Sequence, residues 1–114
     1  MKAKKLSLAD TIKFSREGFS GSVYVEPEDY QGFNALLVTV HGEHPPKRIL
    51  PGNTRCYFVI EGQGTFVLNE DKHTVKEGDL FVVPADNEYC YRGNMKLFEF
   101  NISADNSFGD QLVE

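Results

Sequence analysis

The stretch GEHPPKRILPGNTRCYFVIEG, residues 42–62, decides the fold of this chain. It joins a segment with three prolines and a Pro-Gly turn to a run of aromatic and β-branched residues, which is typical of a strand. The same stretch delivers Arg48 and Arg55 to this run. Because a guanidinium keeps its charge, an arginine needs a partner wherever the strand buries it. The stretch therefore predicts a strand that presents fixed positive charge to a partner or a ligand.

Both faces of the predicted strand are largely apolar. Side chains alternate along a strand, so one face of "RCYFVI" carries Arg55, Tyr57 and Val59. The opposite face carries apolar side chains, namely Cys56, Phe58 and Ile60. Such a strand is covered on both sides. Since a barrel of this length has one interior, another protomer or the N-terminal segment must cover the outside, and we expect a homodimer.

Similar short runs recur on both sides of this stretch. Val, Phe, Tyr, Ile and Thr dominate "ALLVTV", "TFVL", "LFVVP", "EYCY" and "MKLFEFNI". Between the runs lie apparent turns, among them His41-Gly42, "EGQG" and "RGN". Helix signals are limited to one or two turns in "SLADTIKF". This pattern predicts an all-β protein, an antiparallel barrel or sandwich.

The length and the net charge of the chain indicate one acidic domain. The 114 residues are expected to form N-terminal strands or an arm (1–34), a barrel core (35–102) and a C-terminal tail held by Phe108 (103–114). A net charge of −5 argues against a nucleic-acid partner, which would need a basic surface. The sequence shows no signal-peptide core and no membrane span, so we expect no membrane contact and a cytoplasmic location.

The glycines and turns keep the spacing of a known two-part motif. The first part comprises Gly42, Arg48, Leu50, Arg55 and Gly62. The second part lies in "GDLFVVPADNEY", which keeps Gly78 and Pro84 and then places Asp86 and Tyr89 at the next two motif positions. Over residues 35–102 the chain resembles the cupin superfamily, small β-barrels that usually bind a metal. The resemblance implies an antiparallel cupin-type barrel of the jelly-roll kind.

The positions that hold the metal in cupins carry other residue types here. Three histidines and one glutamate in the family correspond to Arg48, Leu50, Arg55 and Tyr89. Arginine has no lone pair for a metal, and leucine has no donor atom. We therefore expect no metal and no other cofactor. A substitute site at His41 and His44 is the alternative, although His44 beside Pro45-Pro46 is expected to be a solvated loop residue.

In cupins the ligand positions point into the barrel, and the resemblance implies that Arg48, Arg55 and Tyr89 converge there. The two-residue period of a strand adds Tyr57 and Tyr91 to the pocket. Two guanidiniums and several phenols suit a small anionic metabolite, such as a carboxylate, a sugar phosphate or a nucleotide sugar. Alternatively, Glu99 on the closing strand neutralises Arg55.

Three functions remain open from the sequence. The first is a metal-free cupin that binds a small anionic metabolite. The second is a metal-independent sugar isomerase or epimerase, in which His41 is the base and Tyr89 the acid. The third is a structural or accessory dimer without a ligand. Whether the protein is an enzyme stays undecided at this level, because fold does not fix function.

Overall fold

The computed structural model describes residues 5–25, 32–104 and 110–113, and strands dominate them. A single turn of 3-10 helix, Leu8–Asp10, precedes the first strand. The strands are β1 (Ile12–Arg16), β2 (Phe19–Val25), β3 (Phe33–Ile49), β4 (Asn53–Leu68), β5 (Asp71–Lys76), β6 (Leu80–Val83), β7 (Glu88–Ser103) and β8 (Asp110–Leu112). Neighbouring strands among these residues pair in the antiparallel sense. The predicted all-β, antiparallel fold class is confirmed.

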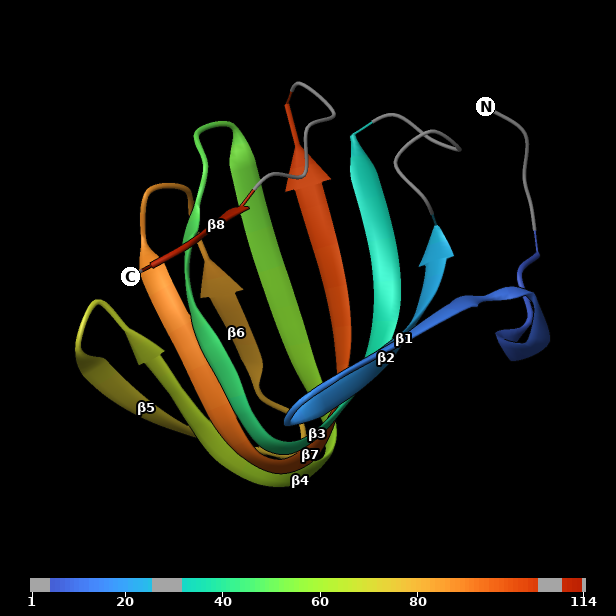
Figure 1. Ribbon diagram of the computed structural model, residues 1–114, viewed down its shortest axis with the longest axis horizontal. Helices are drawn as coiled ribbons and strands as arrows, with labels where there is room; N and C mark the ends of the chain where they lie inside the picture. The colour runs from blue at the N-terminus through green and yellow to red at the C-terminus, as the bar shows by residue number, and fades with distance from the viewer. Residues whose placement is uncertain (1–4, 26–31, 105–109, 114) are drawn as a thin grey trace.

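Three long strands, β3, β4 and β7, run through the whole molecule and fold the sheet over on itself (Figure 1). The strand order is β1-β2-β3-β7-β4-β5, with β6 added to β4 and β8 added to β3. We call the part with β1, β2 and β6 the first half-sheet and the part with β5 and β8 the second half-sheet. Because the long strands cross the bend, each contributes to both walls of the interior.

A row of glycines lies where the long strands bend. Gly93 of β7 pairs with Gly42 of β3 on one side and with Gly64 of β4 on the other. A Cβ atom at Gly93 would lie only 2.6 Å from the Cα of Gly64, and one at Gly42 would lie 3.0 Å from the Cα of Gly18. The backbones approach this closely because no side chain stands between them.

The bend corrects three sequence predictions. The segments His41-Gly42, "EGQG" and "RGN" were expected as turns that end strands, but β3, β4 and β7 continue through them. The ladder between β4 and β7 is maintained on both sides, with one register shift between Val59 and Glu61. A glycine signals a turn locally, and here it instead permits a bend and a bulge within a paired strand.

The interior is lined by alternate residues of the long strands. Tyr57, Val59 and Leu97 are at most 1% exposed. On the opposite face of β4, Phe58 and Ile60 are 40% and 38% exposed. The strand thus turns its Tyr57 face inward, as the alternation predicts. Its other apolar face points outward from the first half-sheet.

The secondary structure near the N-terminus agrees with the sequence prediction, and that near the C-terminus differs from it. The short N-terminal helix is one turn long and leads directly into β1. Residues 110–112, expected within a C-terminal tail, instead form β8 and pair with Lys47–Ile49 of β3. Phe108, expected to hold that tail, lies outside the described residues. No helix in the described ranges is long and apolar enough to cross a membrane.

Substitution of Gly62 tests the bend. Gly62 and Gly78 share nearly the same backbone conformation, with φ of 85° and 92°. A Cβ atom at Gly62 would overlap the backbone of Asn94, whereas one at Gly78 would meet nothing within 4 Å. We expect Gly78→Ala to lower the free energy of unfolding by about 1 kcal/mol and Gly62→Ala by about 3 kcal/mol or more. Urea denaturation of both variants measures the difference, and equal losses would contradict the role of the bend.

Candidate functional site

An opening in the sheet edge leads to the interior. The edge of β3 pairs with β2 up to Val40 and with β8 from Lys47 onward. Between these segments, residues 42–45 have no strand neighbour on this edge in the described part of the chain. Pro45 and Pro46 occupy this part of β3, and neither offers an N–H group to another strand. The prolines thus keep the edge open beside β8.

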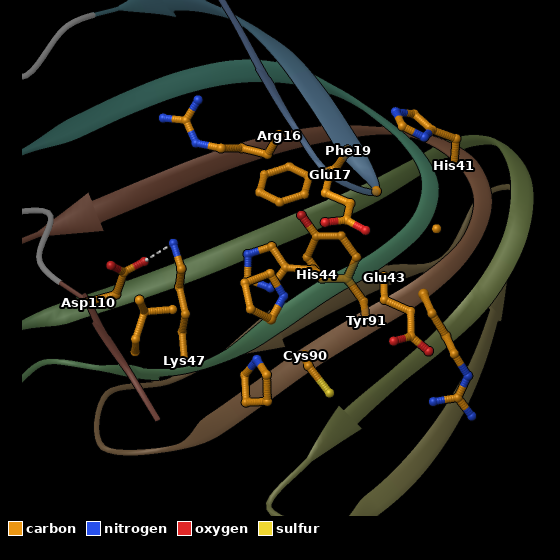
Figure 2. A pocket seen from close by; sticks show the side chains of 16 residues that line it. Arg16, Glu17, Phe19, His41, Glu43, His44, Lys47, Cys90, Tyr91 and Asp110 are labelled. Carbon is orange, nitrogen blue, oxygen red and sulfur yellow. Dashed lines mark ion pairs between the residues drawn. The ribbon is translucent and has the colours of Figure 1, made fainter. Parts of the chain in front are cut away.

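A cavity of about 1350 Å³ extends from this opening (Figure 2). The turn between β1 and β2 forms one side of it, with Arg16 and Phe19. Side chains of His44, Tyr91 and Lys47 line its inner part, and Asp110 of β8 borders it. The cavity is large enough for a metabolite of the size of a nucleoside.

His44 is a buried aromatic residue and not the solvated loop residue expected from the sequence. Its side chain is packed among rings, with centroid distances of 4.4 Å to Tyr91 and 4.9 Å to Phe19. Burial, with the charges of Lys47 and Arg55, lowers the pKa of His44 to about 3. Its Nδ1 atom is buried and has no hydrogen-bond partner among residues 5–25, 32–104 and 110–113. The prolines after it continue β3, so His44 stays on the inward face as a neutral imidazole.

His41 lies on the other face of β3. Leu36, Val38 and Val40 are buried, so alternation turns His41 outward, where it is exposed. It borders only the outer part of the cavity (Figure 2). The sequence leaves open which way His41 points, and the structure places it and the buried His44 in different surroundings, one exposed and one packed among rings.

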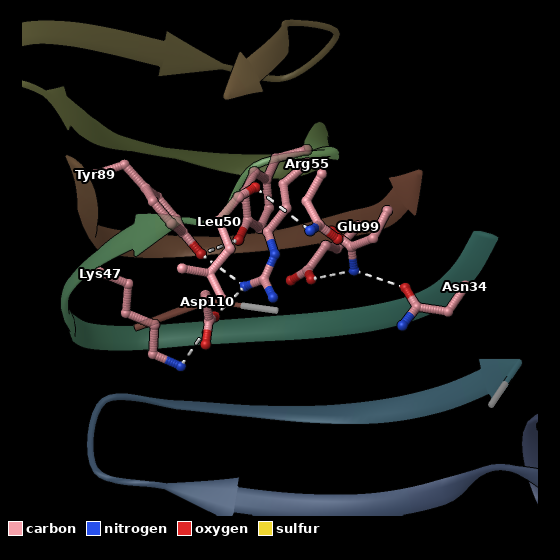
Figure 3. A network of polar contacts seen from close by, with 10 residues as sticks. Asn34, Lys47, Leu50, Arg55, Tyr89, Glu99 and Asp110 are labelled. Atoms are coloured by element: carbon pink, nitrogen blue, oxygen red, sulfur yellow. Dashed lines mark hydrogen bonds and ion pairs between the residues drawn. The ribbon is translucent and has the colours of Figure 1, made fainter. Parts of the chain in front are cut away.

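Arg55 forms the centre of a buried polar network (Figure 3). Its Nη1 atom lies 2.6 Å from Oδ2 of Asp110 and donates a 3.0 Å hydrogen bond to Oη of Tyr89. The hydroxyls of Tyr89 and Tyr57 are 2.9 Å apart. Burial alone would lower the pKa of Arg55, but Tyr89, Tyr57 and the nearby carboxylates raise it overall. The guanidinium therefore remains charged inside the protein.

Asp110 is a site residue that the sequence analysis missed. It lies 3.5 Å from Nζ of Lys47, so one carboxylate contacts two cations (Figure 3). The ion pair that the structure shows for Arg55 is thus with Asp110, whereas the sequence suggested Glu99. A three-residue strand near the end of a chain has no local pattern that would have identified it.

Glu99 and Asn101 extend the network along β7. Asn101 donates hydrogen bonds to Oε2 of Glu99 at 2.8 Å and to Oδ1 of Asn34 at 2.7 Å. Burial raises the pKa of Glu99, although Arg55 acts in the opposite direction. Within the described part of the chain, the buried Oδ1 atom of Asn101 has no hydrogen-bond partner. It is an acceptor without a donor beside Glu99, on a residue outside the lining of the cavity described above.

Arg48 does not converge with Arg55. Its side chain is 43% exposed and donates to the carbonyl of Asp86 and the carboxylate of Glu88. A register shift between His44 and Lys47 reverses the alternation of β3, so Lys47 turns toward Asp110 and Arg48 turns away. The predicted pocket with two arginines is wrong in this respect, since Lys47 takes the second cationic position.

The three predicted tyrosines do lie in the interior. Tyr57, Tyr89 and Tyr91 are at most 2% exposed. Burial raises the pKa of all three phenols, that of Tyr89 to about 12. They are therefore protonated at neutral pH and can donate hydrogen bonds.

The four family ligand positions do not fit a metal. Arg48 is turned outward and Leu50 has no donor atom. Arg55 is engaged with Asp110, and Tyr89 is a protonated phenol that accepts a hydrogen bond from Arg55. The described residues contain no group of three or more His, Cys, Asp or Glu side chains that could hold a metal ion. No chemical step is therefore derived through a metal at this site.

Solved structures with the same fold come from several bacteria. Pac13 of Streptomyces, a nucleoside dehydratase also solved with uridine in substituted forms, superposes with a TM-score of 0.85 at 24% identity, over 100% of this chain and 93% of that one. KdgF from Halomonas sp. gives a TM-score of 0.76 at 13% identity, over 90% and 94% of the two chains. A salicylate 1,2-dioxygenase from Pseudoaminobacter salicylatoxidans gives 0.67 at 21% identity, over 75% of this chain and 26% of that one.

None of the curated proteins matches the chain. Residues 36–97, more than half of the sequence, match the family model described as the cupin domain. The match covers most of the region in which the motif spacing resembles cupins, and the superpositions agree with it. The protein therefore belongs to the cupin domain family.

Proposed function

We propose that this cupin binds a small sugar-bearing metabolite of the nucleoside or nucleotide class between its two half-sheets, without a metal. The observation that carries the proposal is a pair of buried polar atoms, Nδ1 of His44 and Oδ1 of Asn101, for which the described residues supply no hydrogen-bond partner. Leaving such a group unpaired costs about 1–3 kcal/mol. A ligand with hydroxyl or amide groups removes this cost by hydrogen bonding to both.

The walls of the interior support the same ligand class. Tyr57, Tyr89 and Tyr91 provide flat surfaces, and Arg55 provides a charged donor between them. Aromatic faces combined with a few placed polar groups are typical of sites for sugars and bases. Pac13, which shares the fold, has been solved with uridine. We therefore take uridine and its phosphorylated derivatives as probes for this site.

A second function, acid–base catalysis on the bound sugar, is favoured by His44. Its imidazole is neutral, and its ring centroid lies 5.4 Å from that of Tyr89, whose hydroxyl is protonated. A neutral imidazole beside a phenol is a base next to an acid. His44 thus takes the role that the sequence analysis gave to His41, and Tyr89 keeps its own. Pac13, which shares the fold, is described as a nucleoside dehydratase.

We also propose that two copies of the chain associate through the outer face of the first half-sheet. Cross-strand neighbours on this face include Phe58, Phe98 and Leu80. Leu80 and Ile102 are 54% and 51% exposed. A second copy presents the same flat apolar surface, which makes the face complementary to itself. The cytoplasmic location and the absence of a nucleic-acid partner stay predictions from composition.

The two arginines give a matched test of ligand binding. We expect Arg55→Gln to weaken binding about tenfold or more, because a buried charged donor is lost. Arg48→Gln should change the affinity by less than about twofold, since Arg48 is half-exposed and paired with Glu88. Calorimetric titration with uridine, uridine monophosphate and a uridine diphosphate sugar measures both, after circular dichroism has verified folding. Failure of all three probes to bind the unsubstituted protein would contradict the proposed function.

The two histidines give a matched test of catalysis. We expect His44→Gln to lower turnover about 10²- to 10⁴-fold, as for loss of a general base. His41→Gln should retain full activity, because His41 points outward. Incubation of the same probes in heavy water, followed by NMR and mass spectrometry, detects deuterium uptake or loss of water. Equal activity of the two variants would contradict the role of His44.

A lysine on the outer face tests the dimer. Val82 is 44% exposed on β6, and we expect Val82→Lys to convert a dimer into a monomer of 12.9 kDa. Thr74→Lys adds the same charge at an exposed position of β5 in the second half-sheet and should leave the dimer intact. Light scattering coupled to size-exclusion chromatography reports the mass. A monomeric unsubstituted protein would rule this interface out.

A further inference from the structure

Three charged side chains from three different strands meet in the interior. Asp110 of β8 lies 2.6 Å from Nη1 of Arg55 and 3.5 Å from Nζ of Lys47. The side chains of Lys47, Arg55 and Asp110 are 24%, 13% and 21% exposed, so solvent screens the group only partly. A carboxylate held by an arginine and a lysine is also the arrangement by which proteins bind a carboxylate or phosphate group of a ligand.

We propose that Asp110 is a specificity-determining residue, which fills this anion position and makes the site select an uncharged ligand over its phosphate ester. The inference rests on the proposed function, since it concerns the ligand of the same site. It narrows the ligand class to an uncharged sugar-bearing molecule, such as a nucleoside. The anionic ligand expected from the sequence would fit only when Asp110 is absent or displaced.

The charge balance around Arg55 supports this selection. Asp110 neutralises one of the two cations, so an incoming phosphate would have to share their contacts with a carboxylate of the same sign. Glu99 is a second carboxyl group near Arg55 in the described part of the chain. It is buried and held by Asn101, and burial raises its pKa. Asp110 is the carboxylate that contacts both cations directly.

The position of Asp110 is also fixed by the backbone. Asp110 pairs with Ile49, and the next two residues of β8 continue the ladder along β3. The N–H group of Val113 donates a 3.1 Å hydrogen bond to the carbonyl of Pro46. To displace the carboxylate by moving the strand, a ligand would have to break this pairing. An anion of modest affinity therefore does not replace Asp110 at Arg55 and Lys47.

The test measures thermal unfolding with inorganic phosphate, compared with potassium chloride at equal ionic strength. We expect phosphate to leave the melting temperature of the unsubstituted protein unchanged and to raise that of Asp110→Asn by about 3 °C or more. A second substitution, Lys47→Gln, should remove this gain. Glu88→Gln is the matched control, because it also removes a carboxylate from an arginine, the half-exposed Arg48. Phosphate should leave the melting temperature of the Glu88→Gln variant unchanged.

A selectivity measurement completes the test. The unsubstituted protein should bind uridine at least about tenfold more tightly than uridine monophosphate, and Asp110→Asn should shift this ratio about tenfold toward the phosphate ester. Equal stabilisation of both proteins by phosphate, or none of Asp110→Asn, overturns the inference. If that variant does not fold, Asp110→Ser replaces it, and stabilisation of the unsubstituted protein by phosphate still overturns the inference. Should phosphate act as expected while neither uridine nor its phosphate binds, only the proposed function fails.

Discussion

The close approach of β3, β7 and β4 at their bend is the constraint on which the rest of the structure depends. Gly42, Gly93 and Gly64 pair in one row across these strands, and a Cβ atom on Gly93 would lie 2.6 Å from the Cα of Gly64. The bend lets one strand supply both walls of the interior. Tyr91 and Glu99 face it from the two ends of the same strand, β7. The site is therefore built largely from three continuous strands rather than from loops.

Inside this frame the buried charge of Arg55 determines which other groups must be present. A guanidinium taken out of water is stable in the fold only where anions and hydrogen-bond acceptors surround it. Tyr89 accepts one hydrogen bond from Arg55, and Asp110 forms an ion pair with it. Since Asp110 comes from β8, the pairing of this short strand with β3 contributes to stability and to the site at once.

Local patterns in the sequence predict which side chains of a single strand face the interior. They do not predict features that arise from the pairing of several strands. Alternation placed Arg55 and Tyr57 correctly in the interior, because β4 is regular over this stretch. It failed for Arg48, because the irregularity after His44 reverses the faces of β3. The sequence predicts turns at Gly42, Gly64 and Gly93, because a glycine between two apolar runs is typical of a turn. The strands that pair with these glycines are distant in the sequence, so a short segment cannot reveal the bend. Asp110 was missed for the same reason, since its role arises only from the pairing of β8.

The environment of His44 shows how the charge of the interior and its chemistry are linked. Burial and the cations Lys47 and Arg55 lower its pKa to about 3, while Asp110 acts in the opposite direction. At neutral pH, protonation of such an imidazole costs about 1.4 kcal/mol for each unit by which its pKa lies below the pH. The value of about 3 already includes the contribution of Asp110, so the pKa would lie lower still without this carboxylate. The carboxylate that disfavours an anionic ligand therefore also makes proton transfer to His44 easier.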